Sequence, residues 1–449
     1  MQTLSQRIAR FAARLQWDEI PEAVREKSKV SLLHNLGVAI AGQDLLFAPG
    51  FAAGLGEQGP HAAARLLISG RPVTAETAAF VNAALMHARA QDDVYFPGLT
   101  HAGAIMTPAV LAAAEQLGCS GLQVLTALIA GYEAAGAISQ DVAKRTTARG
   151  FRASGIYGGF AAAVGVAHLL ALDEQAMAHV IGLAASMAAG TNQTWVAGTQ
   201  EWQMQVGLAA RNGLLAARLA AAGATAAPDA LEGQAGFYQA FLGDRQGLAS
   251  VGSDLGQTWR SLDVTYKPFA VCAILQAPVT QAIAFTRRHG LAADRIRAVR
   301  LHLCPAEAAY PGTDARGPFL DIGGTLMSAQ FCMALALVEG RVRGIDLRRL
   351  NDLRLQPLVQ RCSVVPDPAL GARSFVLEVD LSDGQTLRHE QHAQGEPFNW
   401  NRHEVMANLQ SMRDELPLNE AGLQRLCDTV LDAEHHDART LVSACISPQ

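Results

Sequence analysis

Apolar residues recur at intervals of three and four along almost the whole stretch from residue 2 to about residue 221, with interruptions at Gly or Pro. This spacing places apolar side chains on one face of a helix, so it predicts a series of helices that bury those faces against each other. Pro21 begins one predicted helix, Gly118 ends another, and Ser120 is suited to cap the next. Because half of the residues are hydrophobic, only 6% are aromatic and 41 are Gly, the composition also favours closely packed helices.

The pattern changes after Asp263. Residues 295–305, RIRAVRLHLCP, alternate apolar and basic side chains with a period of two, which predicts a strand. Residues 374–392 alternate again around an Asp-Gly pair, a strong signal for a hairpin turn. Between these two segments, residues 324–340 predict a helix that ends at Gly340. This part of the chain therefore combines strands with helices.

The helical pattern returns from Asn401 to the end of the chain. We therefore predict a mostly α protein with a smaller α+β domain. The predicted parts are a large helical domain (1–267), an inserted, lid-like α+β domain (268–398) and C-terminal helices (399–449) that return to the helical domain.

The charge pattern excludes one class of partner. The net charge is −5 and no long Lys/Arg run occurs, so we expect no binding to nucleic acid. Charged residues make up 17% of the chain, below the ~25% typical of soluble domains, which indicates extensive buried surface and an oligomer interface. The seven cysteines include no Cys-x-x-Cys pair, so they predict neither a zinc module nor a disulfide framework and favour a reducing compartment.

The N-terminal segment lacks the apolar core of a signal peptide, so we expect a cytoplasmic protein. Residues 153–172 carry no formal charge and are long enough to span a membrane. They also contain His168, several Gly and many Ala, a composition that inserts weakly. We therefore expect a buried helix there and no membrane partner.

Residues 86–108, MHARAQDDVYFPGLTHAGAIMTP, set titratable side chains between two Ala-rich helical runs. Asp92 and Asp93 are followed by a Pro-Gly turn and then by Thr100 and His101. An imidazole for proton transfer and a carboxylate to orient it would thus share one short loop, which predicts an active-site loop. In the alternative interpretation the carboxylates are solvated, Thr100 caps the next helix and His101 faces water.

Residues 144–159, KRTTARGFRASGIYGG, concentrate cations beside a Gly-rich turn at the start of a predicted helix. Guanidinium groups bind carboxylates in a bidentate manner, so this segment, with Arg152, is a candidate anion site. The alternative is a solvated basic loop. Trp202, Gln203 and Gln205 begin the predicted helix 200–221 and are candidates to line a pocket, although a Trp is often simply packed.

Several segments in this order resemble the MmgE/PrpD family. The segments that carry the resemblance are HNLGVAIAG (34–42), the Asp-Asp to Thr-His loop (92–101), Arg-Gly-Phe (149–151), LLALD (169–173), GLAARNGLLAARLA (207–220), Lys-Pro-x-x-x-Cys (267–272) and MSAQFCMALALVEG (327–340). The resemblance implies a large helical domain and a small α+β domain, a homodimer, and an active site between the domains. It also implies cofactor-independent dehydratase, decarboxylase or epimerase chemistry on a small di- or tricarboxylate.

The resemblance covers nearly the whole chain, but some chemical positions differ. The residues that match the family pattern are Asp92, Asp93, Thr100, His101 and Lys267. The residues that depart from it are Ala90, Arg152, Trp202, Gln205, Gln276 and Phe331. At Arg152 the family pattern has a His, so a proton carrier is replaced by a fixed cation.

These positions suggest roles. We assign His101 as the general base or acid, Asp93 as the carboxylate that orients it, and Lys267 as the opposite acid or the cation that stabilises an enolate-like intermediate. Tyr157 is a candidate hydroxyl for the same pocket. The candidates for substrate binding are Arg152, Asp92, Thr100, Trp202, Gln203 and Gln276. We predict no metal, because the histidines are dispersed without metal-ligand spacing. The resemblance implies that no cofactor is needed.

We therefore predict a lyase or isomerase that abstracts a proton next to a carboxylate, by epimerisation or isomerisation or by dehydration, rather than by two-step decarboxylation. The alternative hypothesis is a family member that binds a carboxylate ligand or a partner without turnover.

Overall fold

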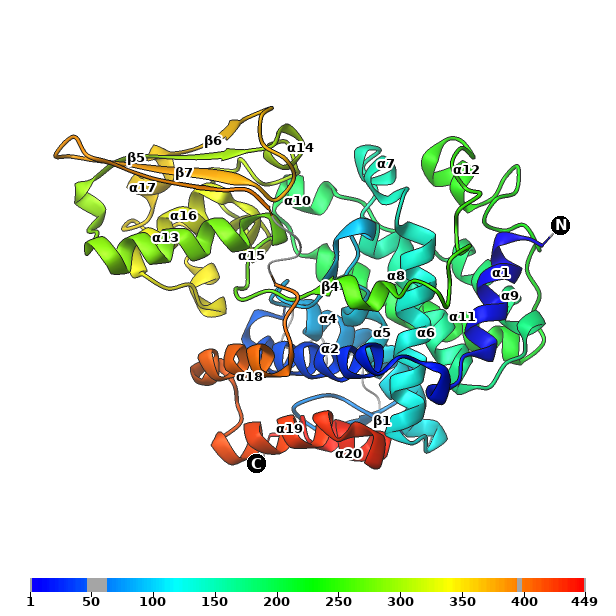
Figure 1. Cartoon of the computed structure of the whole chain (residues 1–449). Helices are drawn as coiled ribbons and strands as arrows, with labels where there is room; N and C mark the ends of the chain where they lie inside the picture. The colour runs from blue at the N-terminus through cyan, green and yellow to red at the C-terminus, as the bar shows by residue number, and fades with distance from the viewer. Residues whose placement is uncertain (1, 47–62, 394–397, 448–449) are drawn as a thin grey trace.

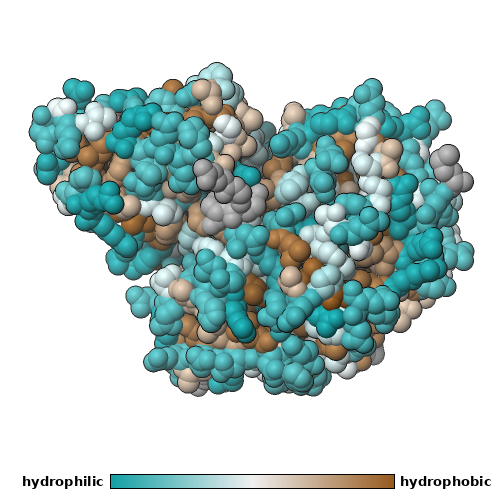
Figure 2. Space-filling model, in the orientation of Figure 1, coloured by the Kyte–Doolittle hydropathy of each residue, from teal (hydrophilic) through white to brown (hydrophobic). Residues whose placement is uncertain are grey.

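The computed structural model describes residues 2–46, 63–393 and 398–447. Helices dominate, and the four-stranded sheet lies in one lobe that sits beside a larger, helical lobe (Figure 1). On the face shown in Figure 2 a notch separates the two lobes, and hydrophilic residues cover most of the surface. The predicted fold class, mostly α with a smaller α+β domain, is confirmed.

The larger lobe is built from helices that pack around α8 and α11. Its helices are α1 (Leu4–Arg14), α2 (Glu22–Ala41), α4 (Ala75–His87), α5 (Ala102–Leu117), α6 (Gly121–Ser139), α7 (Ala143–Ala148), α8 (Ala153–Leu169), α9 (Glu174–Ser186), α10 (Gln193–Ala197), α11 (Glu201–Ala221) and α12 (Phe237–Leu242). Small residues allow close packing: a Cβ on Gly131 of α6 would lie 2.6 Å from the carbonyl oxygen of Ala161 in α8. Bulkier side chains would force these helices apart.

The helix ends follow the local signals in the sequence. The side chain of Ser120 accepts a hydrogen bond from Gln123 N and caps α6, as predicted. Gly118 ends α5 with a φ of +69°, a conformation that Gly adopts without strain. The uncharged segment that begins at Ala153 forms the buried helix α8. Among the described residues, α6 is the one helix long and apolar enough to cross a membrane by length and composition, and 89% of that stretch is buried inside the protein.

The C-terminal helices α18 (Arg402–Ser411), α19 (Glu420–Leu431) and α20 (Ala438–Ser443) lie against the helical lobe, at the bottom of Figure 1. α18 and α19 pack on α2, and α20 packs on α5. A Cβ on Gly37 would lie 2.3 Å from Leu409, so the smallest residue lets α18 approach α2 closely. The C-terminal helices thus complete a lobe whose other helices lie much earlier in the sequence.

The smaller lobe contains a four-stranded sheet with the order β6-β5-β7-β8. β5 (Ile296–Leu303) pairs in parallel with β6 (Cys362–Pro366) and antiparallel with β7 (Phe375–Leu381), which pairs antiparallel with β8 (Thr386–Gln391). The predicted Asp-Gly turn joins β7 to β8, and its Gly384 has a φ of +88°.

Helices cover one face of this sheet (Figure 1). They are α13 (Gln276–His289), α14 (Pro305–Ala308), α15 (Ile322–Met327), α16 (Ala329–Glu339) and α17 (Gln356–Arg361). As predicted, Gly340 ends α16, with a φ of +61°. A layer of helices on a sheet buries the apolar faces of both, which gives this lobe its own core.

Two short strands pair with each other close to the junction of the lobes. β3 (Val94–Tyr95), in the loop after α4, pairs antiparallel with β4 (Val264–Thr265). This pairing brings residues 264–268, at the start of the chain's passage into the smaller lobe, against the loop that follows Asp92. The core of the smaller lobe also includes Ala88, Trp195 and Trp202 from the helical lobe. Residues of the two lobes therefore meet around the end of α4.

Candidate active site

The segment between α4 and α5 folds back so that its two ends meet. His87 is the last residue of α4, and His101 is the N-cap residue of α5. Between them, Ala90 and Leu99 have φ values of +48° and +50°. A left-handed backbone is unfavourable for residues with a side chain, so it persists here because the surrounding contacts hold it. The turns place the two imidazoles on opposite sides of Asp92.

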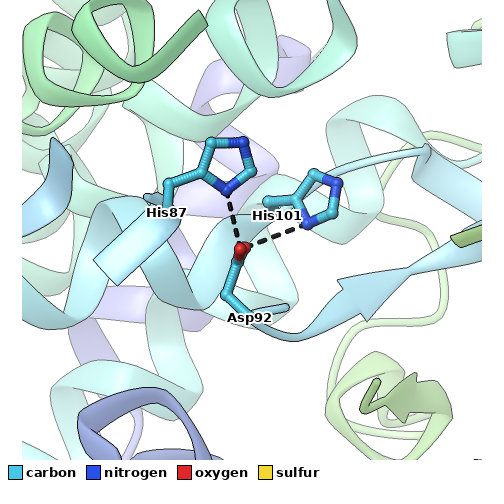
Figure 3. A group of neighbouring side chains, drawn as sticks. All are labelled: His87, Asp92 and His101. Carbon is cyan, nitrogen blue, oxygen red and sulfur yellow. Dashed lines mark hydrogen bonds and ion pairs between the residues drawn. The ribbon is translucent and has the colours of Figure 1, made fainter. Parts of the chain in front are cut away.

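Asp92 is the centre of this arrangement (Figure 3). Its Oδ1 lies 2.7 Å from His87 Nδ1, and its Oδ2 lies 3.0 Å from His101 Nδ1. Burial alone would raise the pKa of Asp92, but the contacts with His87 and His101 and the charge of Lys267 outweigh burial and hold the pKa well below its usual value. Asp92 is therefore an ionised carboxylate at neutral pH.

His101 has a defined tautomer. Its Nδ1 lies 2.8 Å from the backbone carbonyl oxygen of Asp93, which can only accept a hydrogen bond. Nδ1 therefore carries the hydrogen, and Nε2 of the neutral ring keeps a free lone pair. Burial lowers the pKa of His101, which favours this neutral form, and its side chain is 17% exposed whereas that of Asp92 is fully buried. Nε2 is thus available as a base.

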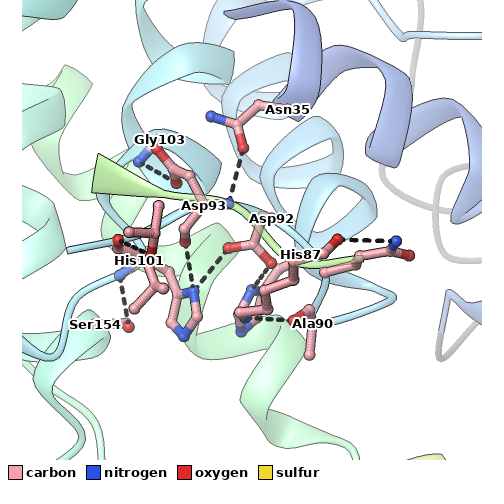
Figure 4. A network of polar contacts seen from close by, with 12 residues as sticks. Asn35, His87, Ala90, Asp92, Asp93, His101, Gly103 and Ser154 are labelled. Carbon is pink, nitrogen blue, oxygen red and sulfur yellow. Dashed lines mark hydrogen bonds and ion pairs between the residues drawn. The ribbon is translucent and has the colours of Figure 1, made fainter. Parts of the chain in front are cut away.

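The expectation that the side chain of Asp93 orients His101 is wrong. The carboxylate of Asp93 points to the opposite side of the loop, where it accepts hydrogen bonds from the hydroxyl of Tyr132 and from Gly103 N, the latter at 3.2 Å (Figure 4). Asn35 Oδ1 accepts from Asp93 N at 3.1 Å. Burial raises the pKa of Asp93 to about 7. Asp92 and the carbonyl of Asp93 orient His101 instead.

Arg152, the N-cap residue of α8, lies on the far side of His87. Its Nη2 lies 2.6 Å from His87 Nε2, and its Nη1 donates to the carbonyl of Trp202 and to Gln205 Oε1, the latter at 3.2 Å. The guanidinium also stacks on Trp195, 5.0 Å from the ring centre. It is 3% exposed, and burial lowers its pKa to about 10. Arg152 thus stays a cation at neutral pH.

Lys267 follows β4 and is the second buried cation. Its Nζ donates to the carbonyl of Ala90, and the Gln91 amide donates to the carbonyl of Lys267 at 3.1 Å. Burial lowers the pKa of the ammonium, and its charge affects His101, Asp92 and Arg152. Among the described residues, neither Lys267 nor Arg152 has a carboxylate within 4.0 Å.

Two other predicted positions, Gln276 and Gln203, hold backbone groups. The Gln276 amide donates to the carbonyls of Phe269 and Val271, and its oxygen accepts from Phe269 N. The Gln203 amide donates to the carbonyl of Leu45 at 3.1 Å. Both amides bind backbone in this structure, and substrate binding by Gln276 and Gln203 stays a prediction.

Tyr157 is also outside the cluster. Its hydroxyl lies 3.2 Å from Thr146 Oγ1 and its ring packs edge-on against Phe237. The residue is five positions after Arg152, so the helical turn directs it into the core of the larger lobe. The prediction that Tyr157 supplies a hydroxyl to the pocket of Arg152 is therefore wrong.

Thr100 and Trp202 lie beside the cluster. Thr100 does not cap α5, because His101 occupies that position; its hydroxyl is buried and has no partner among the described residues. The Trp202 ring packs edge-on against His87 at 5.2 Å, and its Nε1 likewise has no described partner. These two polar atoms remain available to a ligand.

Phe331 packs edge-on against Phe319 inside the smaller lobe. No role was predicted from the sequence for His87, Tyr310 or Cys272. Tyr310 and Cys272, from the smaller lobe, lie close enough to Arg152 and Lys267 respectively to interact with them electrostatically, and burial raises the pKa of both groups. The position of His87, in the last helical turn before an acidic loop, could have indicated a site residue. Tyr310 lies in a segment without regular structure, and no pattern in the sequence indicated it.

His87, Asp92 and His101 offer potential metal-ligand atoms within 4.8 Å of one another. However, Nε2 of His87 faces the guanidinium of Arg152, and both Nδ1 atoms face Asp92. A divalent cation here would displace these hydrogen bonds and lie close to Arg152 and Lys267. The donor set therefore fits an acid–base site better than a metal centre.

Comparisons with known proteins identify the family of this chain. The MmgE/PrpD N-terminal domain matches residues 6–247, and the MmgE/PrpD C-terminal domain matches residues 269–409. A cis-aconitate decarboxylase of Aspergillus terreus (strain NIH 2624 / FGSC A1156) is 28% identical over 350 residues, which cover 74% of this chain and 71% of that protein. The cis-aconitate decarboxylase-like protein oryM of Aspergillus oryzae (strain ATCC 42149 / RIB 40) is 23% identical over 408 residues, 85% of this chain and 84% of that protein. The chain is thus a lyase-type enzyme, and it belongs to the MmgE/PrpD family.

Proposed function

We propose that this enzyme removes water from a small hydroxytricarboxylate without a cofactor, by proton transfer at a carbon next to a carboxylate. The observation that carries the proposal is the free Nε2 of His101 beside two buried cations, Arg152 and Lys267, that have no carboxylate partner within 4.0 Å among the described residues. The relatives named as cis-aconitate decarboxylases support a tricarboxylate as the substrate class.

The buried charges favour an anionic ligand. Asp92 contributes one negative charge, whereas Arg152 and Lys267 contribute two positive charges; the pKa values of both imidazoles are lowered by burial. Uncompensated buried charge is costly, so a carboxylate that binds here gains both ion pairing and relief of that cost. A substrate with several carboxylates can engage both cations at once.

The groups also suit an elimination. His101 Nε2 takes the proton from the carbon next to a carboxylate, and the positive charge of Lys267 stabilises the enolate-like intermediate. Lys267, whose pKa burial lowers, then gives a proton to the departing hydroxyl, which leaves as water. Arg152 holds a carboxylate but transfers no proton at neutral pH, and of the two imidazoles that contact Asp92, His101 is the one with a free nitrogen. That inventory favours dehydration over a decarboxylation with two proton carriers.

The test is an NMR assay in heavy water with citrate, isocitrate, 2-methylcitrate and cis-aconitate, in the presence of a metal chelator. We expect an alkene product, or its rehydration, with deuterium incorporated next to a carboxylate, and no reaction with His101→Asn. Release of carbon dioxide from cis-aconitate would identify decarboxylation instead, and exchange without net reaction would identify epimerisation or isomerisation. Tight binding without exchange on any substrate would replace the enzyme hypothesis with ligand binding.

Arg152 provides a second test. Arg152→Lys keeps the charge but loses the planar fork, so we expect KM to rise by about tenfold or more while kcat changes less. Two further properties stay proposals: a homodimer, which light scattering after size-exclusion chromatography tests, and a cytoplasmic location, which imaging of a tagged protein tests.

A further inference from the structure

His87 is engaged at both ring nitrogens. Its Nδ1 lies 2.7 Å from Asp92 Oδ1 (Figures 3 and 4). Its Nε2 lies 2.6 Å from Arg152 Nη2. The side chain is 1% exposed, and the rings of Trp202 and His101 pack against it at 5.2 and 4.9 Å. The imidazole therefore joins the carboxylate at the centre of the site to the guanidinium that lies behind it.

Its two partners dictate its protonation. A guanidinium only donates hydrogen bonds, so Nε2 of His87 must accept from Arg152 and carries no hydrogen. An ionised carboxylate only accepts, so Nδ1 must donate to Asp92. His87 is thereby held as the neutral Nδ1–H tautomer. A second proton would have to lie between Nε2 and the guanidinium, where it would break the hydrogen bond and bring two cations together.

The contacts of Arg152 show what this tautomer achieves. Nη1 donates to the Trp202 carbonyl and to Gln205, one hydrogen of Nη2 goes to His87, and Trp195 covers a face of the guanidinium. The Nε hydrogen and the second Nη2 hydrogen donate to no described residue. Arg152 is thus held on several sides while part of its hydrogen-bonding capacity is left over. Such fixed, unused donors suit the recognition of a carboxylate.

Other roles for His87 fit the contacts less well. A proton carrier needs a nitrogen that faces the substrate, and both nitrogens of His87 face protein groups. A residue that merely fills space needs no pair of short polar contacts to an ionised carboxylate and a buried cation.

We propose that His87 is a positioning residue: a permanently neutral imidazole bridge, anchored by Asp92, that fixes the guanidinium of Arg152 so that its remaining N–H groups bind one carboxylate of the substrate. The part of this inference that concerns the substrate rests on the proposed function. The part that concerns the bridge itself does not, and it can be tested without any substrate.

The direct test is the NMR of the ring nitrogens in protein labelled with ¹⁵N-histidine, with the His87 signals identified by their loss in His87→Gln. We expect a protonated Nδ1 and an unprotonated Nε2, unchanged from pH 5.5 to 9. In Arg152→Met, which lacks the donor, we expect the His87 signals to shift and the Nε2–H tautomer to appear. A wild-type His87 that titrates in this range, or that carries its hydrogen on Nε2, overturns the bridge whatever the activity of the enzyme. If a variant does not fold, the titration of the wild-type protein decides alone.

The functional test compares KM with kcat. We expect His87→Gln to raise KM for the tricarboxylate by about tenfold, with kcat within about threefold of the wild type, because orientation of the carboxylate is lost while His101 remains. His168→Gln is the matched control: His168 is a half-buried histidine on α8 that contacts the carbonyl of Ala12, so its KM should not change. A large loss of kcat with unchanged KM would make His87 a participant in proton transfer and would overturn the proposal. If no tricarboxylate is turned over, the Kd of the tricarboxylate is measured for His87→Gln and for the wild type, and we expect the same tenfold rise. Failure of the proposed reaction therefore leaves this test intact.

Discussion

In the loop between α4 and α5, the adjacent residues Asp92 and Asp93 point to opposite faces, and the two faces present different groups to them. Asp92 faces two imidazoles and has a pKa well below its usual value. Burial acts in the opposite direction but is outweighed. Asp93 faces Tyr132, Asn35 and Gly103, and burial raises its pKa to about 7. Both carboxylates are buried, so burial does not separate them. What separates them is the kind of group that each one meets.

The difference divides the work of the loop. The Asp92 face gathers the groups that can move or hold charge, namely His101, His87 and, farther out, Arg152. The Asp93 face fastens the loop to α2, α5 and α6 through neutral hydrogen bonds. Chemistry on one face thus depends on a rigid attachment on the other, as expected where catalytic groups must be held in place.

Removal of His101 should produce the largest effect on the Asp92 face. We expect His101→Ala to lower kcat by ~10²-fold or more, because His87, the other imidazole on Asp92, is engaged at both ring nitrogens. The measurement is steady-state turnover of the tricarboxylate found in the NMR assay. His403→Ala, at an exposed histidine of α18, is the control and should retain full turnover. Turnover by His101→Ala close to the wild-type value would assign proton transfer to another group.

A matched pair of variants tests the two faces directly. Asp92→Asn places an amide against one imidazole N–H and removes a charge, and the loss of a hydrogen bond to a charged group is worth ~1.5–3 kcal/mol. We therefore expect kcat to fall about 10- to 100-fold. Asp93→Asn keeps an acceptor for Tyr132 or Gly103 and should stay within about threefold of the wild type. Equal losses in the two variants would mean that the faces do not differ in function.

Gln276, in the smaller lobe, provides a further test, because its amide binds backbone groups and is expected to act on stability, as Asp93 does. Gln276→Leu leaves buried carbonyls of Phe269 and Val271 without a donor, which costs ~1–3 kcal/mol per group. We expect the free energy of unfolding to fall by about 2 kcal/mol in chemical denaturation, with KM unchanged. A rise in KM without a loss of stability would support the prediction that Gln276 binds substrate.

The smallest effect is a dependence of stability on pH. The pKa of Asp93 is about 7 in the folded protein, against ~3.9 for an unperturbed Asp, so between these values the folded protein holds a proton that the unfolded chain releases. Stability from this group is therefore full below pH ~3.9 and is lost as the pH rises towards 7. We expect the melting temperature of Asp93→Asn, relative to the wild type, to rise by about 2 °C or more from pH 5 to pH 8.

This comparison cancels the contributions of buried groups that do not interact with Asp93, such as His168. A difference that stays constant with pH would show that Asp93 is ionised throughout this range.

The sequence by itself determined the fold class, the helix ends at Gly118, Ser120 and Gly340, and the position of the loop that holds His101. These features depend on local physics: apolar periodicity, capping side chains and the backbone freedom of Gly act within a few residues of one another. The resemblance to the MmgE/PrpD family added the order of the segments along the chain, which the matches to both domains of that family confirm.

Only the tertiary structure decided the direction of each side chain at the site. Whether Asp92 or Asp93 faces His101 depends on Tyr132 and Asn35, which approach from helices that are distant in sequence. The bridge from His87 to Arg152 likewise joins the end of α4 to the start of α8. In an irregular loop no fixed period sets which way a side chain points, so partners elsewhere in the fold select among the possible directions. That is why the sequence located the loop of the candidate active site but assigned its neighbouring carboxylates to the wrong faces.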